Sequence, residues 1–263
     1  MCGVAAIFSN DINLENQISK VIKKISHRGP DDKGFYTNNN LSLGSCRLSI
    51  FDFSANAKMP MTDSLNRYFV VYNGEIYNFP EIKKKFNIQT KTNTDTEILL
   101  EMYVKKGEEC VQYFNGIFSF VIYDKVNETI FCCRDRLGIK PLYYYLDNKV
   151  FVACSEIKGI HEIIPKSINY DKLKTYLNTS FYDFSEQTFY KDVKQLEPAH
   201  YFIFDLKKKS HSIKKYWELN NEAKINFSHN QAIDSLDDLI KNAFNLQVRT
   251  DTNLGVNLSS GVD

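Results

Sequence analysis

The sequence lacks any apolar run long enough to cross a membrane, and its N-terminus lacks the charged and apolar regions of a secretory signal. It also has almost no excess charge, because 33 Lys and Arg residues against 32 Asp and Glu residues leave a formal net charge of +1. These absences argue against membrane insertion, export and binding of nucleic acid through an overall basic field. We therefore expect a cytoplasmic protein that binds neither membranes nor nucleic acid.

The six cysteines form no CxxC pair and no Cys/His spacing typical of zinc, so no metal site is expected. In a reducing cytosol they should be free thiols. Cys132 and Cys133 lie in a strand-like run and are expected to be small core residues. Cys2 has an unusual position directly after the initiator Met, although chance also explains a cysteine at a poorly ordered chain end.

At 263 residues the chain can form one large domain, or one domain and the start of another. Hydrophobic periodicity predicts helices over 12–26, 95–106 and 170–178, and another that begins after an N-cap at Ser228. It predicts strands at 2–8, 34–36, 41–48, 68–72 and 150–157, a meander over 117–147, and a hairpin of "HYFIFDL" with "SIKKYWEL". "HRGPDDKG" is expected to be a loop, "NGEIYN" a turn and "NLGVNL" a buried strand.

A reactive Cys2 would need a base, and a free α-amino group with a pKa of about 7.7–8 suits that role. An N-terminal nucleophile carries this base on its own backbone, provided that Met1 has been removed. Acyl transfer also needs donors for an oxyanion. Asn73 and Gly74 could supply a side-chain amide and a backbone N–H, but Asn-Gly is also a common turn pair.

Recognition of a substrate carboxylate calls for a cationic fork, which Arg47 in "CRLSIFD" could provide. Asp95 could bind an amino group, or it could be the N-cap of the helix that it begins.

The motifs "MCGVAAIF", "HRGPDDKG", "CRLSIFD", "NGEIYN", "TDTEILL", "FNGIFSFVIYD", "RDRLGIKPLYY" and "ACSEIKGI" occur in the order typical of glutamine-hydrolysing asparagine synthetases. Over residues 2–210 the chain resembles this branch of the class II glutamine amidotransferases. The resemblance implies a four-layer αββα N-terminal nucleophile (Ntn) hydrolase fold, of class α+β, that requires no cofactor for glutamine hydrolysis. Purine-pathway and hexosamine amidotransferases share such a domain, but the residues of these motifs favour the synthetase branch.

The resemblance also implies roles for individual residues. Cys2 would attack the amide carbon of glutamine, its α-amine would carry the proton, and Asn73 and Gly74 would form the oxyanion hole. Arg47 would bind the α-carboxylate, and Glu75 with Asp95 the α-ammonium group. The residues expected to shape the pocket beside Arg47 are Leu48, Ser49, Ile50 and Phe51. "HRGPD" and "RDRLGIKPLYY" are assigned to packing and loop ordering, and His27 to a structural role.

The end of the sequence resembles the start of a second domain. A connecting segment is expected over 211–227, and an incomplete ATP-pyrophosphatase domain over 228–263. Its phosphate-binding loop would comprise Leu258, Ser259, Ser260, Gly261, Val262 and Asp263, with Asp263 a hypothetical Mg²⁺ ligand. Ser260 departs from the family pattern, which has Gly there, and so does Ala199 in "LEPAHYF".

The whole enzyme implied by the resemblance uses ATP and Mg²⁺ to amidate a carboxylate, by default aspartate, with ammonia from glutamine, and it forms a homodimer. Two alternatives stay open: a related enzyme that amidates a sugar acid or a natural-product intermediate, and a non-catalytic scaffold that has kept the fold.

Overall fold

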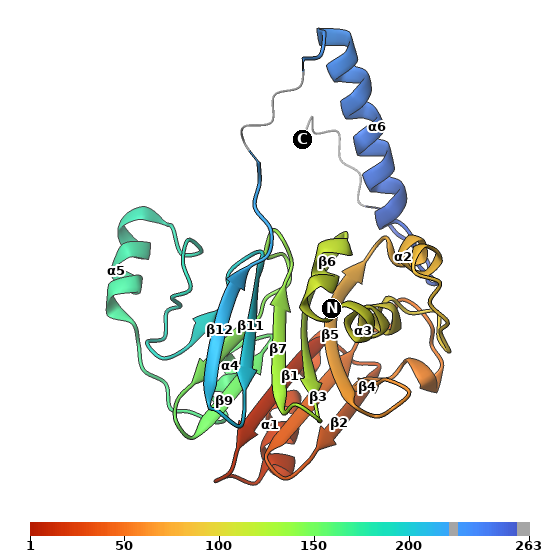
Figure 1. The fold of residues 1–263 in the computed structure, drawn as a ribbon. Helices are drawn as coiled ribbons and strands as arrows, with labels where there is room; N and C mark the ends of the chain where they lie inside the picture. The colour runs from red at the N-terminus through yellow and green to blue at the C-terminus, as the bar shows by residue number, and fades with distance from the viewer. Residues whose placement is uncertain (221–225, 257–263) are drawn as a thin grey trace.

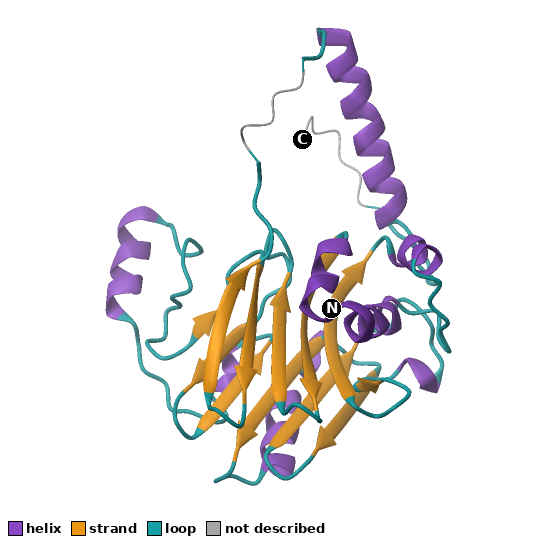
Figure 2. Ribbon diagram, in the orientation of Figure 1, coloured by secondary structure: helices purple, strands orange, loops and turns teal. Residues whose placement is uncertain are grey.

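A computed structural model describes residues 1–220 and 226–256. In this part of the chain the strands form two six-stranded sheets that lie face to face (Figures 1 and 2). The first sheet has the order β10-β8-β9-β1-β3-β2, and the second has the order β12-β11-β7-β6-β5-β4. Neighbouring strands in both sheets are antiparallel.

The elements have the following bounds. The strands are β1 (Gly3–Ser9), β2 (Asp32–Thr37), β3 (Leu41–Arg47), β4 (Met61–Thr62), β5 (Tyr68–Ile76), β6 (Gly116–Asp124), β7 (Thr129–Arg134), β8 (Tyr143–Leu146), β9 (Val150–Cys154), β10 (Lys194–Gln195), β11 (His200–Asp205) and β12 (Ser210–Lys215). The α-helices are α1 (Leu14–Lys24), α2 (Phe79–Lys85), α3 (Asp95–Lys106), α4 (Ile157–Ile160), α5 (Tyr170–Thr179) and α6 (His229–Gln247).

Three apolar clusters define four layers. One cluster fills the space between the sheets and joins Val4 and Leu43 of the first sheet to Val71 and Phe202 of the second. A second cluster packs α1 and α4 on the outer face of the first sheet. A third packs α2 and α3 on the outer face of the second. The expected αββα architecture is therefore confirmed.

The helices follow their end signals in the sequence. The side chain of Thr94 caps α3 by accepting a hydrogen bond from the backbone N–H of Glu97, and Gly107 ends this helix with a φ of 57°. Ser228 and Gln231 form a capping box at the start of α6, which confirms the expected N-cap. The helices expected over 12–26 and 170–178 are present as α1 and α5.

The turn expected at "NGEIYN" is wrong for its first residues. Asn73, Gly74 and Glu75 continue β5, where they pair with Ser119, Phe118 and Ile117 of β6. The ladder to β6 overrides the local turn preference of the Asn-Gly pair.

The expected three-strand meander is also wrong in its last strand. β6 and β7 pair in the second sheet, but β8 crosses to the first sheet and pairs with β9 and β10. The loop expected over 27–34 is shorter, because β2 begins at Asp32. Both differences arise from pairing with remote strands, of β8 with β9 and β10 and of β2 with β3.

The C-terminal part differs from expectation at two places. The connecting segment cannot begin at residue 211, because β12 pairs with β11 through Lys215. In the run expected to be a buried strand, the described residues 253–256 have no strand structure, and Leu254 and Val256 are 57% and 66% exposed. No neighbouring strand within the described residues pairs with them.

Other expectations can be compared directly. Within the described ranges, no helix has the length and hydropathy needed to cross a bilayer. All six cysteines are free thiols, and Cys132 and Cys133 are buried. Ala199 has a φ of 62°, in the left-handed region that favours glycine, and this explains why glycine suits that turn better.

Candidate functional site

Four distant parts of the chain meet around Cys2. Gly3 at the start of β1 pairs with Cys46 of β3, which places Cys2 near Arg47 at the end of that strand. Gly74 of β5 and Asp95 of α3 complete the wall. The pocket between them has a free volume of about 30 Å³ and is lined by Cys2, Arg47, Leu48, Ile50, Phe51, Met59, Tyr72, Gly74, Thr94, Asp95 and Thr96.

The Cys2 thiol is partly buried at the edge of an apolar cluster. Its Sγ donates to the carbonyl oxygen of Leu48 at 3.7 Å. Burial raises the pKa of this thiol above its usual value. Because the thiol stays protonated near neutral pH, a nucleophilic role requires a base that removes its proton. In the described chain the α-amino group belongs to Met1, and burial lowers its pKa.

Arg28 positions the backbone of Cys2. Its Nε donates to the carbonyl oxygen of Cys2 at 2.9 Å, and its Nη1 lies 3.0 Å from Oε1 of Glu156. The side chain is only 8% exposed. "HRGPD" therefore also fixes the backbone of Cys2, in addition to ordering a loop. The sequence did not reveal this role of Arg28, because its partners are remote in the chain. Its neighbour His27 contacts Glu156 at 2.8 Å, in keeping with a structural role.

Gly74 lines the pocket, and its neighbour Asn73 is outside the lining but carries an unpaired donor. Nδ2 of Asn73 is buried and has no hydrogen-bond partner among the described residues. A buried unpaired amide typically costs about 1–3 kcal/mol, so its retention calls for an explanation. A Cβ atom at Gly74 would lie 2.3 Å from the carbonyl oxygen of Ile117, which accounts for the glycine at this position.

Asp95 is a buried acceptor and not the N-cap of α3. Its Oδ2 accepts hydrogen bonds from the Tyr72 hydroxyl at 2.6 Å and the Ile76 N–H at 2.9 Å. Burial raises the pKa of Asp95. Tyr72 was missed in the sequence, where it is one aromatic residue of a strand.

Glu75 follows Gly74 in β5 and does not line the pocket. Burial, together with the charge of Asp95, raises the pKa of Glu75 to about 7.

Arg47 and the loop after it form the other side of the pocket. Nη2 of Arg47 donates to the carbonyl oxygens of Phe51 at 2.7 Å and Asp52 at 2.9 Å. Two of the five N–H donors of the guanidinium are thereby used. Leu48, Ile50 and Phe51 line the pocket as expected. Ser49 is outside the lining, and its backbone N–H donates to Asp31 at 2.8 Å.

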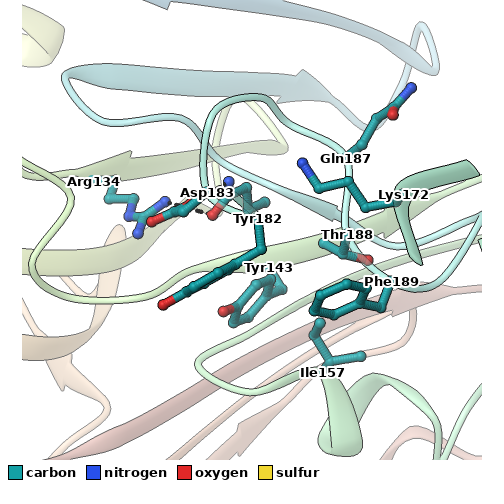
Figure 3. A pocket seen from close by; sticks show the side chains of 10 residues that line it. Arg134, Tyr143, Ile157, Lys172, Tyr182, Asp183, Gln187, Thr188 and Phe189 are labelled. Atoms are coloured by element: carbon teal, nitrogen blue, oxygen red, sulfur yellow. Dashed lines mark hydrogen bonds between the residues drawn. The ribbon is translucent and has the colours of Figure 1, made fainter. Parts of the chain in front are cut away.

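A separate pocket of about 270 Å³ lies near α5, with Arg134 and Asp183 on one side and Lys172 and Phe189 on the other (Figure 3). Arg134 donates there to the carbonyls of Gly138, Lys140 and Leu196 and to the side chain of Gln195. These contacts order the turn of "RDRLGIKPLYY", which confirms the loop-ordering role expected for this motif.

The expected phosphate-binding residues 258–263 lie outside the described residues. This part of the prediction is therefore unchanged.

Comparison with known proteins adds two kinds of finding. A family model described as a glutamine amidotransferase domain matches residues 1–217. The putative glutamine-hydrolysing asparagine synthetase 2 of Methanocaldococcus jannaschii is 40% identical over 287 residues, which cover 100% of this chain and 55% of that protein. The glutamine-hydrolysing asparagine synthetase 3 of Bacillus subtilis is 30% identical over 272 residues, which cover 100% of this chain and 44% of that protein.

The chain thus spans about half the length of the curated relatives that it matches. Among solved structures, the glutamine phosphoribosylpyrophosphate amidotransferase of B. subtilis superposes with a TM-score of 0.60 at 16% identity. That match covers 82% of this chain and 49% of the other, and it supports the fold alone.

Proposed function

The chain belongs to the glutamine amidotransferase family, and from that premise we propose that the Cys2 pocket hydrolyses glutamine to glutamate and ammonia. The observation that carries this proposal is the meeting of Cys2, Arg47, Gly74 and Asp95 in one pocket, although they come from four distant parts of the chain. A nucleophile, an anion-binding fork, a backbone donor and an ammonium acceptor are the groups that this reaction needs.

The chemistry begins when removal of Met1 transfers the free α-amine to Cys2. The amine takes the thiol proton as Sγ attacks the amide carbon of glutamine. The carbonyl oxygen becomes an oxyanion, which accepts hydrogen bonds from Nδ2 of Asn73 and the N–H of Gly74. The amine then gives its proton to the leaving nitrogen, and ammonia departs. Water, deprotonated by the same amine, cleaves the γ-glutamyl thioester to glutamate and restores the thiol.

Recognition of glutamine uses the charged groups around the pocket. The free donors of Arg47 bind the α-carboxylate, and the buried carboxylate of Asp95, with Glu75 nearby, attracts the α-ammonium group. The loop Leu48–Phe51 encloses the side chain between these groups.

For a protein of the relatives' full length, we propose the activity in their names, asparagine synthesis with ammonia from glutamine, here by amidation of aspartate. The names of the relatives support this assignment. ATP and Mg²⁺ as its requirements belong to this proposal and come from the sequence resemblance. A cytosolic location and a homodimer belong to the same proposal, and so does the alternative of another carboxylate as the acceptor.

The test measures glutamate and ammonia release from glutamine by the purified chain, with the intact mass recorded to establish loss of Met1. We expect hydrolysis by the processed protein and at least a 1,000-fold loss, to order of magnitude, in Cys2→Ala. Cys110→Ala, which removes a buried thiol away from the pocket, is the matched control. Hydrolysis that persists in Cys2→Ala would refute the assignment, and so would a processed wild-type chain that neither hydrolyses glutamine nor reacts at Cys2 with a glutamine-like diazoketone.

A further inference from the structure

The three residues Arg249–Asp251, just after α6, lie against the loop that borders the Cys2 pocket; we call them the strap. The hydroxyl of Thr250 and the N–H of Asp251 both donate to the carbonyl oxygen of Ile50, at 3.2 and 3.1 Å. In return, the N–H of Asp52 donates to Oδ2 of Asp251 at 3.1 Å. About 200 residues of chain separate these partners, so the contact is purely tertiary.

Arg249 anchors the strap on α2. Its two terminal nitrogens reach the two carboxylate oxygens of Glu81 at 2.8 and 3.1 Å, and Nη1 also donates to the carbonyl of Tyr77 at 3.3 Å. This paired geometry is the more directional form of an ion pair. Figure 1 shows the end of α6 beside α2, where this anchor lies.

The loop held by the strap also holds Arg47. Nη2 of Arg47 donates to the carbonyls of Phe51 and Asp52, and Asp52 is the residue whose N–H binds Asp251. Oδ2 of Asp52 accepts a further bond from the N–H of Asn93, two residues before Asp95. Asp52 is thus bonded to the strap, to Arg47 and to the segment that leads into α3.

The pocket has little free volume, so the position of the loop affects the space available to a ligand. The free volume of about 30 Å³ is enough for one or two water molecules, so the position of the wall residues affects how a glutamine molecule fits. The wall contains strand residues of the two sheets and two groups of residues outside them. One group is Leu48, Ile50 and Phe51 of the loop, and the other is Met59 with Thr94–Thr96 at the start of α3. The loop is the part of the wall that the strap contacts.

We propose that the strap is a positioning element for glutamine binding: Asp251 and Thr250 hold the loop in the position that aligns Arg47, and Arg249 fixes the strap to α2. This proposal rests on glutamine being the ligand of the Cys2 pocket. Its consequence is that displacement of the chain after α6 changes the affinity of the pocket for glutamine. The strap residues do not touch the reacting atoms.

The first measurement is hydrogen–deuterium exchange of the loop in the full chain. Asp251→Ala removes the acceptor for the Asp52 N–H, and we expect exchange in the peptide containing residues 48–53 to accelerate about tenfold, as expected for loss of roughly 1.4 kcal/mol of protection. Asp251→Asn keeps an acceptor oxygen and should stay close to wild type. Asp237→Ala breaks an exposed ion pair with Lys241 on α6 and is the matched control.

The second measurement is the steady-state kinetics of glutamine hydrolysis. Asp251→Ala should raise KM about three- to tenfold and leave kcat within about twofold, because the strap acts on recognition and not on Cys2. Thr250→Val, which removes one hydrogen bond at nearly constant volume, should shift KM in the same direction by a smaller factor. Its thermal unfolding, compared with wild type, controls for loss of structure.

Several outcomes would overturn the strap's role. They are unchanged loop exchange and KM in Asp251→Ala, a fall in kcat at constant KM, or equal effects of the Ala and Asn substitutions. If the wild-type chain fails to hydrolyse glutamine and to react at Cys2, the proposed function fails, while the exchange experiment still decides whether the strap holds the loop.

Discussion

The two sides of the Cys2 pocket are built in different ways. On one side, Cys2 precedes β1, and Asn73 and Gly74 lie inside β5, so regular ladders with β3, β9 and β6 hold the reacting groups. On the other side, Arg47 ends β3, and the residues after it form a loop outside both sheets. The loop is held by bonds to Asp31, Asn93 and the strap.

This difference separates chemistry from recognition. Ladder pairs hold the reacting groups within the small tolerance that bond formation needs. A loop fixed by a few contacts can shift at a modest free-energy cost, which lets it adjust to a substrate in a small pocket. Substitutions of Asn73 and Gly74 should therefore lower kcat, and substitutions of Arg47 and the loop should raise KM.

After Cys2→Ala, the largest effect is expected on the sheet side, for Asn73→Ala. Loss of one oxyanion donor should lower kcat by about 100- to 1,000-fold and change KM little. Because Nδ2 of Asn73 has no partner among the described residues, thermal stability should not fall. Steady-state kinetics and thermal unfolding of the same sample test both statements. A large loss of stability, or a change confined to KM, would remove Asn73 from the oxyanion hole.

Arg47→Lys tests the loop side. Lysine keeps the charge but loses the planar fork, and it cannot hold two loop carbonyls while it binds a carboxylate. We expect KM for glutamine to rise about 10- to 100-fold, with a smaller fall in kcat. If kcat falls and KM does not change, the division between the two sides is wrong.

Glu75 gives recognition a pH dependence. With its pKa raised to about 7, this carboxyl is mostly protonated at pH 6 and mostly ionised at pH 8. The α-ammonium of glutamine is charged at both pH values, so binding should be tighter at pH 8, by a factor of up to about ten. Calorimetry of glutamine with the Cys2→Ala protein measures this difference without turnover.

The control for this pH dependence is Glu75→Gln in the same Cys2→Ala background. It should bind glutamine weakly and equally at both pH values. A pH dependence that survives in this variant would show that another group titrates.

The smallest effect lies outside both sides of the pocket. Ser180 ends α5 in the left-handed region with a φ of 61°. Ser180→Gly should stabilise the protein by about 0.5–1 kcal/mol in urea unfolding, because glycine adopts this conformation without strain. Ser180→Ala keeps the strain and should give no such gain. A change of kcat or KM in either variant would mean that the pocket depends on α5.

Local signals predicted the elements that depend on local structure. α1, α3 and α6 have apolar spacing together with Asn13, Thr94 or Ser228 as caps, and β1 is an apolar run of strand length. The residue types around Cys2 led to the proposed nucleophile, fork and acceptor before their geometry was known.

What the sequence did not reveal depends on partners far away in the chain. The Asn-Gly pair continues β5 because β6, more than 40 residues later, pairs with it. Arg28 and Tyr72 have site roles only because folding brings them to Cys2 and Asp95. The strap has no recognisable sequence motif, because its proposed role depends on its contacts with a loop about 200 residues earlier in the chain.

The pairing of β1 has a consequence for biosynthesis. β1 lies between β3 and β9, and its partner residues in β9 extend to Cys154. During synthesis from the N-terminus, one edge of β1 stays unpaired until its partner strand β9, about 145 residues later, has been made. Until β9 is made, β1 has a neighbour on one side only, and the aminopeptidase that the proposed function requires for removal of Met1 can act in that interval. Maturation of the nucleophile can thus precede its enclosure, and the timing follows from the order of strands in the sheet.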